Sequence, residues 1–359
     1  MPLVQTDVNL VGRTLEDDVF TSTGSLLLST GMTLTTVHIY SLLRNGIFSV
    51  RVSLPEQKND SAYMSVVTIE GQLEKLSYDH ETAASYVKAM ELTKGLFDKV
   101  TEDSIPSLRE FGQAFFPVAE QVLKRTGIFR PLYALEGSDS YTYRHSINVG
   151  MLSALIAKLM NQSDEDIILI GQAGFLHDVG KMLVPKEILM KPGKLTKEEY
   201  EQMKMHTVYG HELIAKMEGA PDMLAKCALM HHERMNGTGY PLGLKGDAIP
   251  FACQIIAVAD QFDAICSDRV YKERTSPFVA AQILWQSACE GHLNPEIVTK
   301  FAHYIVSLYA GSKAVLNTGE EVEVVFIHKD EPMRPLVRRG EDFFDLRSHR
   351  VWDIEKMIV

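Results

Sequence analysis

The sequence predicts a mainly α-helical protein in which one all-helical domain is flanked by smaller parts. The expected order is a small α+β N-terminal domain at residues 1–55, a helical connector at 63–125, the all-helical domain at 126–310 and a short β-rich C-terminal appendix at 311–359. Apolar residues recur at helical spacing through the middle of the chain, whereas they alternate with polar residues near its two ends. Capping residues followed by glutamate or proline mark helix starts in the middle region.

The N-terminal region combines short signals of different kinds. Glycines mark turns on both sides of the apolar run 25–28, and residues 36–44 have helical spacing. Residues 48–52 alternate between apolar and polar side chains, as in a strand. The stretch 54–61 is polar and contains proline, which predicts a linker.

The connector at 63–125 is dominated by an amphipathic helical pattern. Its apolar positions include Ala84, Val87, Met90, Leu92 and Leu96. We expect these helices to pack against the rest of the chain. The alternative is a dedicated dimerisation or signalling helix, which leaves a homodimer open.

Helix signals are strongest in the region 126–310. Thr196 and Glu199 form a capping box, and Ser276 and Asn294 each precede a proline suited to the first turn of a helix. Two apolar stripes follow one another along the chain: Leu152, Leu155, Ile156 and Leu159, then Ile167, Ile168, Ile170 and Phe175. Each stripe predicts a helix that is buried along one face.

The pattern changes after Gly311. Val322, Val324 and Phe326 are spaced two apart, as in a half-buried strand, and two prolines precede the next apolar run. The C-terminal segment is therefore expected to be rich in β-strands.

Composition restricts the class of protein. The chain of 359 residues is 45% apolar and 23% charged, as in soluble globular proteins. Its net charge of −11 argues against broad contact with a nucleic acid polymer or an anionic membrane, while a local basic pocket could still hold a small anion. No signal peptide and no membrane-spanning apolar run is found, so a cytoplasmic protein is expected. The cysteines lack C-x-x-C spacing and are expected to be free buried thiols: Cys227, Cys253, Cys266 and Cys289.

Seven metal-competent side chains occur in one part of the chain. They are His145, His177, Asp178, His206, His231, His232 and Asp260. Imidazoles and carboxylates without a thiolate favour iron, manganese or similar ions over a structural zinc site. Asp178 could bridge two ions with its two oxygens, and two ions about 4 Å apart suit in-line displacement at phosphorus. A single histidine is more often a hydrogen-bonded core residue, and His211, five residues past His206, is expected to be a supporting or surface group.

Seven segments of the chain form a larger pattern around these residues. They are Y-R-H-S-I-N-V (143–149), F-L-H-D-V-G-K (175–181), K-P-G-K-L-T-K-E-E-Y (191–200), H-T-V-Y-G-H (206–211), H-H-E-R-M-N-G-T-G-Y-P-L-G-L-K-G-D-A-I-P (231–250), A-V-A-D-Q-F-D-A (257–264) and S-D-R-V-Y-K (267–272). In their order and spacing they resemble the HD-GYP branch of the HD phosphohydrolase superfamily. The resemblance implies an all-helical HD-type catalytic domain that hydrolyses cyclic di-GMP at a metal cluster.

The resemblance also implies a division of the ligands between two ions. One divalent ion would be held by His145, His177, Asp178 and Asp260, and the second by His206, His231 and His232, with Asp178 bridging. Some family members hold a third ion with a glutamate four residues before the first histidine. That position is Tyr141 here, so two ions are expected, most readily iron or manganese. Because Tyr141 replaces that glutamate, it stays open whether hydrolysis stops at pGpG or continues to GMP.

Substrate contacts are implied in the same way. Lys181 matches a phosphate-contacting lysine, and Arg269 and Lys272 match basic residues that hold the substrate's phosphates. The alternative for Arg269 and Lys272 is a solvated helix end, and Tyr240 either faces a guanine base or packs its own loop. In the expected reaction a hydroxide held between the ions at Asp178 attacks phosphorus in line, Lys181 helps to hold the phosphate charge, and the ribose 3′-oxygen leaves.

Two other classes of function stay open from the sequence. The first is a weakly active cyclic dinucleotide receptor or interaction module that contacts a protein partner through the G-Y-P loop (239–241). The second is another enzyme on the same scaffold, namely a phosphohydrolase acting on another nucleotide, a phosphodiesterase for a mixed cyclic dinucleotide, or a di-iron oxygenase. A preference for guanine over adenine is not readable from these residues.

Overall fold

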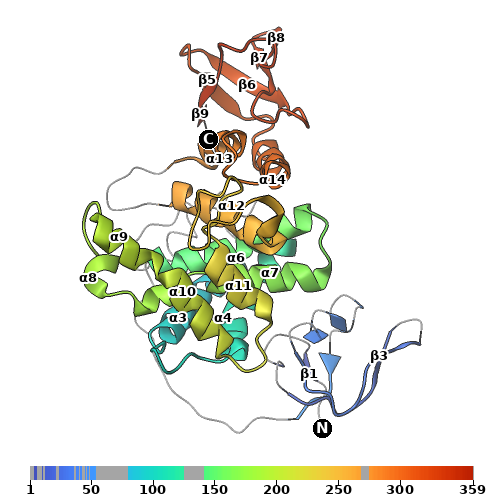
Figure 1. Cartoon of the computed structure of the whole chain (residues 1–359). Coiled ribbons are helices and arrows are strands. Elements are labelled where there is room, and N and C mark those ends of the chain that lie inside the picture. Colours follow the sequence, from blue (N-terminus) through green and yellow to red (C-terminus); the bar gives the residue numbers. More distant parts are fainter. Residues whose placement is uncertain are drawn as a thin grey trace.

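A computed structural model describes residues 80–124, 141–267 and 275–358, together with residues 4–5, 10, 13–21, 24–35, 38–39, 41–42, 45, 47 and 49–53. Within these ranges the protein is mainly α-helical, as predicted, with short strands in the N-terminal region and a small sheet at the C-terminal end (Figure 1). The linker expected at 54–61 lies outside the described residues.

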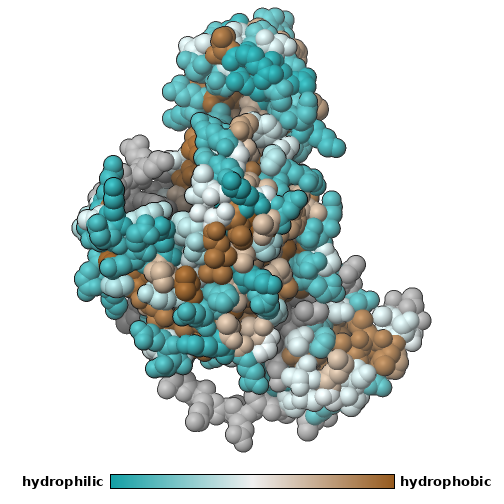
Figure 2. Space-filling view, in the orientation of Figure 1, coloured by the Kyte–Doolittle hydropathy of each residue, from teal (hydrophilic) through white to brown (hydrophobic). Residues whose placement is uncertain are grey.

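Two antiparallel strand pairs form the described N-terminal region. β1 (Val4–Gln5) pairs with β4 (Ser49–Val50), and β2 (Val19–Phe20) pairs with β3 (Leu26–Leu28). Residues 38–39 and 41–42 are helical, as their spacing predicted. The apolar side chains of this region, including Leu15, Leu34 and Ile39, form a core of their own. The cross-strand partners Phe20 and Leu26 are each 53% exposed. Figure 2 shows hydrophobic surface over part of this region.

The described part of the connector contains two helices, α3 (His80–Phe97) and α4 (Leu108–Lys124), which pack against each other and against α6. Val87, Met90 and Leu96 are buried, as the amphipathic pattern predicted. Leu92 does not follow the prediction, because it is 42% exposed. It lies five residues after Val87, which places it about 140° around the helix from that buried position.

The central helices are α6 (Tyr141–Leu159), α7 (Asp164–Leu176), α8 (Lys186–Leu189), α9 (Lys197–Lys204), α10 (His206–Ala215), α11 (Asp222–Met230), α12 (Phe251–Cys266), α13 (Pro277–Cys289) and α14 (Pro295–Ser307), with short 3₁₀ helices η2 (Val179–Leu183) and η3 (Gly246–Ala248). The predicted starts are confirmed. Thr196 and Glu199 form a complete capping box at α9, and the side chains of Ser276 and Asn294 cap α13 and α14 before their first-turn prolines. Local sequence therefore sets where these helices begin.

The long helices α6, α7 and α12 form the centre of the bundle, with α10 and α11 packed beside them. Both apolar stripes predicted from the sequence are largely buried there. The ring of Phe175 stacks on that of Phe115 from α4, with centroids 4.9 Å apart. The connector thus shares one apolar core with the central helices. No helix in the described part of the chain is both long enough and apolar enough to cross a bilayer.

The C-terminal strands form one antiparallel sheet in the order β8-β7-β6-β5-β9, which confirms the predicted β-rich segment. The strands are β5 (Lys313–Leu316), β6 (Glu321–Phe326), β7 (Leu336–Arg339), β8 (Asp342–Asp345) and β9 (Ile354–Ile358). Ala314 and Val322 belong to the same apolar core as the helices, and Gln282 of α13 donates a hydrogen bond to the carbonyl of Ile354. Much of the sheet face seen in Figure 2 is hydrophilic.

All four cysteines are free, and three of them are buried. The sulfur atoms of Cys227 and Cys253 lie 3.5 Å apart inside the bundle. Cys289 is exposed, contrary to the prediction that every thiol is buried. It is the last residue of α13, and the chain turns toward solvent there.

Candidate metal centre

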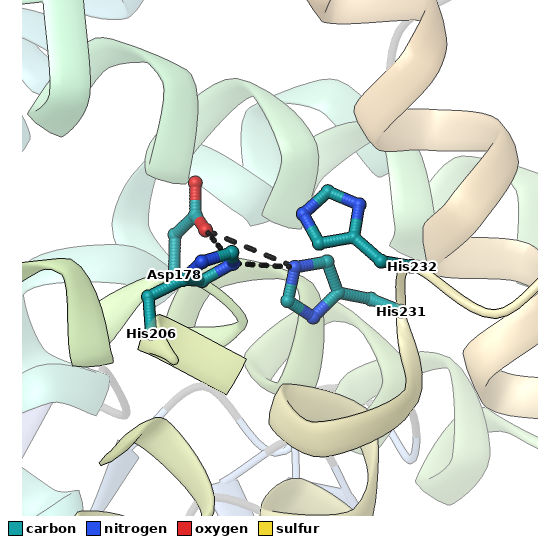
Figure 3. A group of neighbouring side chains, drawn as sticks. All are labelled: Asp178, His206, His231 and His232. Carbon is teal, nitrogen blue, oxygen red and sulfur yellow. Dashed lines mark hydrogen bonds and ion pairs between the residues drawn. The ribbon is translucent and has the colours of Figure 1, made fainter. Parts of the chain in front are cut away.

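The seven predicted ligands come from different helices and meet at one place. His145 lies in α6 and Asp260 in α12, His177 and Asp178 lie between α7 and η2, His206 begins α10, and His231 and His232 directly follow α11. All are buried except His232, which is half-buried. Figure 3 shows Asp178, His206, His231 and His232 turned toward one another.

A close approach between η2 and α10 brings Asp178 to His206. A Cβ atom on Gly180 would lie 2.0 Å from the carbonyl oxygen of His206 and 2.4 Å from the nitrogen of Gly210. No side chain fits in that space, so the approach requires glycine at position 180. Asp178, two residues earlier, is thereby held against the start of α10.

The two carboxylate oxygens of Asp178 face different histidines. Oδ1 lies 3.3 Å from His206 Nε2 and 3.8 Å from His231 Nε2, as the dashed lines in Figure 3 mark. Oδ2 lies 3.2 Å from His177 Nε2 and 3.5 Å from His145 Nε2. One carboxylate therefore faces two separate sets of imidazole nitrogens, which is the geometry that a bridging ligand needs.

Asp260 lies beside the second of these sets. Its Oδ1 is 3.1 Å from His145 Nε2 and 3.9 Å from His177 Nε2, and its Oδ2 is 3.9 Å from His232 Nδ1. Two groups have ligand atoms within 4.8 Å of one another: Asp178, His206, His231 and His232, and His145, His177 and Asp178. Among the described residues, the half-buried His211 belongs to neither group.

Hydrogen bonds at Nδ1 leave Nε2 of four histidines directed into the cluster. Nδ1 of His177, His206 and His231 lies 2.6, 2.7 and 2.9 Å from the main-chain carbonyls of Gly174, Met203 and Ala228. Nδ1 of His145 lies 2.7 Å from Oδ2 of Asp263. A carbonyl or carboxylate accepts a hydrogen bond, so Nδ1 carries the proton and Nε2 keeps its lone pair. This is the tautomer that binds a metal through Nε2.

Burial keeps three of the imidazoles neutral. It lowers the pKa of His206 to about 4 and that of His232 to about 3, and it lowers the pKa of His231 well below its usual value. A neutral imidazole is the form that binds a metal ion. These three side chains therefore need lose no proton to act as ligands at neutral pH.

The two aspartates of the cluster are charged, whereas these histidines are neutral. Burial acts to raise the pKa of Asp178, but interactions with His177 and Lys181 outweigh it and hold that pKa well below the usual range. For Asp260, burial again acts to raise the pKa, but interactions with the neighbouring histidines, His145 first, outweigh it and hold that pKa well below the usual range. Both carboxyl groups are thus ionised at neutral pH, as ligands must be.

Two buried atoms of the cluster test whether it suits a metal ion. Within the described residues, Nε2 of His177 and Oδ1 of Asp178 are buried without any hydrogen-bond partner. Orphaned buried polar atoms are unfavourable, and a bound cation would satisfy both. The nitrogen and oxygen donors, ionised carboxylates and neutral imidazoles fit a divalent transition metal. The cluster is compatible with a metal centre.

The predicted substrate contacts are only partly described. Lys181, at 21% side-chain exposure, forms an ion pair with Oδ2 of Asp178. The ring of Tyr240 lies against that of His232, with centroids 4.6 Å apart, and burial raises the pKa of its hydroxyl. Arg269 and Lys272 fall outside the described residues.

Sequence reasoning missed two side chains that hold this site in place. Asp263 is fully buried and binds His145, and the buried Glu233 accepts hydrogen bonds from the main-chain nitrogens of Leu242 and Leu244 beyond Tyr240. Both residues stand inside the recognised motifs. Asp263, three residues after Asp260 on α12, shares its helical face, and that spacing was the available signal.

A family model matches the part of the chain that holds the cluster. Residues 130–297 match the model described as the HD domain. This segment is therefore similar to HD domains. This confirms the recognition made from the motifs, and all seven candidate ligands lie within the matched HD domain.

Proteins with named activities are similar to parts of this chain. A cyclic di-GMP phosphodiesterase of Pseudomonas aeruginosa is 34% identical over 231 residues, which are 64% of this chain and 55% of that protein. A cyclic di-GMP phosphodiesterase of Thermotoga maritima is 38% identical over 223 residues, or 62% and 57%. A 3′3′-cGAMP-specific phosphodiesterase of Vibrio cholerae is 36% identical over 162 residues, or 45% and 35%. The chain spans little more than half the length of the first two relatives.

Proposed function

We propose that the HD domain is a metal-dependent phosphodiesterase that hydrolyses cyclic di-GMP. The observation that carries the proposal is the position of Asp178, whose two oxygens face two sets of imidazole Nε2 atoms. The names of the two relatives that match most of this chain support the substrate. A single structural metal site would not need a carboxylate that faces two sets of histidines.

We propose that the ligands divide between two ions. His145, His177 and Asp260 would hold one together with Oδ2 of Asp178, and a second set would hold the other together with Oδ1: His206, His231 and His232. The donor types favour iron or manganese. Tyr141 begins α6 four residues before His145, where a carboxylate would be needed to add a third ion, so the proposal is limited to two.

The chemistry would combine the ions with the charged side chains around them. Two divalent ions at this site would lower the pKa of water and draw negative charge from the phosphoryl oxygens. Asp178 fixes the distance between the two ligand sets, and Lys181 beside it places a positive charge where the phosphate enters. Addition of water at phosphorus breaks the bond to the ribose 3′-oxygen, which leaves with a proton. The linear pGpG is then the first product, and a second hydrolysis would give GMP.

A second candidate substrate is 3′3′-cGAMP, because one of the relatives carries that specificity in its name. Both substrates present the same phosphodiester to the cluster and differ in one base. Among the described residues, Tyr240 offers a ring face, which accepts guanine or adenine by stacking. The two substrates must therefore be separated by experiment.

The test uses the full chain, purified without oxygen and loaded with Mn²⁺ or Fe²⁺. Cyclic di-GMP, 3′3′-cGAMP and linear pGpG are supplied separately, and products are resolved by chromatography while bound metal is measured. The Asp178→Ala variant should lose bound metal and turnover together. His211→Ala, which alters a histidine of α10 outside the cluster, is the matched control and should retain both.

Each outcome bears on one rival function. Unchanged turnover in Asp178→Ala would reject the proposed centre. Tight binding of cyclic di-GMP by the metal-loaded wild type without product would favour the receptor. Hydrolysis confined to other nucleotides would favour a different phosphohydrolase.

A further inference from the structure

A buried tyrosine of the connector is joined to the metal cluster through a series of hydrogen bonds. Tyr86 lies on α3, outside the residues that match the HD domain, and is only 2% exposed. Its hydroxyl donates a hydrogen bond to Oδ1 of Asn148 on α6, at 2.8 Å. Asn148 is 2% exposed and stands three residues after His145.

The hydrogen bond from Tyr86 is the first of three that end at a candidate ligand. Nδ2 of Asn148 donates to Oδ1 of Asp263 at 2.9 Å, and Nδ1 of His145 lies 2.7 Å from Oδ2 of the same carboxylate. The donors and acceptors fix the direction of the whole series. A carboxylate only accepts, so Asn148 must present its NH₂ group to Asp263, and its oxygen must face the hydroxyl of Tyr86.

We propose that Tyr86 is a positioning residue of the metal centre, and that α3 is therefore a structural part of the site. The hydroxyl holds the amide of Asn148, the amide orients Asp263, and Asp263 fixes the ring and tautomer of His145. The inference rests on the proposed metal-dependent function. It goes beyond that function because it assigns part of the site to a helix outside the HD domain match.

The physical reason is that a buried polar group that loses its hydrogen-bond partner cannot turn to water for another. Without the hydroxyl, Oδ1 of Asn148 loses this buried donor, and the amide can turn its oxygen toward Asp263. That rotation removes a hydrogen bond from the carboxylate and loosens its hold on His145. The aromatic ring itself would stay, so Tyr86→Phe changes the hydrogen bond and keeps the packing.

The experiment measures Mn²⁺ binding to the metal-free full chain by titration calorimetry, with metal content as a second measure. Groups that hold a ligand directly change metal affinity by about 10- to 100-fold, and Tyr86 acts through two intermediates, so Tyr86→Phe should weaken binding of one ion about three- to tenfold. The matched control is Tyr309→Phe, which also removes a hydroxyl from a buried tyrosine, one that packs on Phe278 of α13. It should bind both ions as the wild type does.

A second readout separates positioning from general damage. With cyclic di-GMP, Tyr86→Phe should lower kcat at limiting Mn²⁺, leave KM unchanged, and regain wild-type kcat at excess Mn²⁺. A fault in folding would not be corrected by metal in this way. In a double-variant cycle, Asn148→Ala should remove most of the additional effect of Tyr86→Phe, since both act through the same hydrogen bonds.

Three results would overturn the inference: unchanged Mn²⁺ affinity in Tyr86→Phe, an equal loss in Tyr309→Phe, or additive effects in the cycle. Wild type that binds Mn²⁺ and hydrolyses no cyclic dinucleotide would instead overturn the proposed function. The titrations would still decide the role of Tyr86 in that case.

Discussion

The histidines of the cluster are held in two different ways. His177, His206 and His231 stand at helix ends, and each donates from Nδ1 to a carbonyl in the last turn of a helix. His145 stands inside α6 and is held by a side chain, Asp263 of α12. The last four carbonyls of a helix have no partner within the helix, whereas those of a helix interior are already used. A histidine at a helix end can therefore be oriented locally, while one inside a helix needs help from a neighbouring helix.

This contrast divides the site into two parts with different weaknesses. The main-chain-anchored part (His177, His206 and His231) depends on how closely the helix ends approach one another. The side-chain-anchored part (His145 with Asp263) depends on a hydrogen-bond network that crosses α3, α6 and α12. Substitutions can be chosen to break either part alone.

Gly180→Ala should have the largest effect, because it breaks the main-chain-anchored part. The added Cβ would meet main-chain atoms at 2.0 and 2.4 Å, which no rotamer change relieves. We expect the free energy of unfolding to fall by about 3 kcal/mol, measured by urea titration, with loss of metal binding. Gly210→Ala, on the other side of the same approach, is the control, since its Cβ would meet the Ala228 side chain at 3.2 Å and the main chain of Gly180 no closer than 3.5 Å. Equal losses in the two variants would contradict the role given to this approach.

Asp263→Ala should break the side-chain-anchored part. It removes the acceptor of His145 Nδ1 and of Asn148 Nδ2 in a fully buried place. Affinity for one ion should fall by about 10- to 100-fold, so that metal content at limiting Mn²⁺ drops from two ions toward one. Ser267→Ala, which removes a longer 3.2 Å bond to the same carboxylate, should change little. Loss of both ions from Asp263→Ala would show that the two parts are not independent.

The metal-free protein should become less stable as pH falls from about 6.5 to about 4. The folded pKa values of His206 and His232, about 4 and about 3, lie below the unfolded value, so the unfolded state binds more protons in this window. Each pKa unit corresponds to about 1.4 kcal/mol, which makes the total decrease roughly 2 to 4 kcal/mol once relaxation of the site is allowed for. Urea titrations across this range would measure it. His206→Gln should flatten the dependence, and a stability that rises toward pH 4 would contradict the burial effect.

The smallest expected effect concerns the open side of the cluster. Nζ of Lys204 lies 5.6 Å from the ring centre of Tyr240 and 5.5 Å from that of Tyr200. Exposed contacts of this kind contribute about 0.5 to 1 kcal/mol, so Lys204→Met should raise KM for cyclic di-GMP about two- to fivefold without changing kcat. Steady-state kinetics would measure both. A change in kcat would place Lys204 nearer the reacting phosphate than the structure suggests.

Local sequence signals, such as helix-capping residues, made much of the fold predictable. The helix starts at Thr196, Ser276 and Asn294 depend on neighbouring residues, so the sequence alone located them. Leu92 and Cys289 were misplaced because burial depends on which face a helix turns to its neighbours, and helical spacing alone does not decide that.

The same distinction applies to the site. The candidate ligands stand in motifs whose spacing is readable, and six of them form two groups that share Asp178. The contributions of Asp263 and Tyr86 follow from the approach of α12 and α3 to α6, which joins residues far apart in the chain. Such contacts are a property of tertiary packing and leave no periodic signal.

The position of α14 has a practical consequence for dissecting the protein. The HD match ends at residue 297, within the first turn of α14, yet Phe301 of that helix packs edge-on against Phe262 of α12 at 4.9 Å. A fragment cut at the family boundary would lose Phe301 and expose Phe262 on the helix that carries Asp260. A fragment cut before β5 would lose β9 and expose the part of α13 that β9 contacts. Such fragments should aggregate or lose affinity for metal for reasons unrelated to catalysis. The smallest dependable unit for biochemistry therefore runs from α3 through β9.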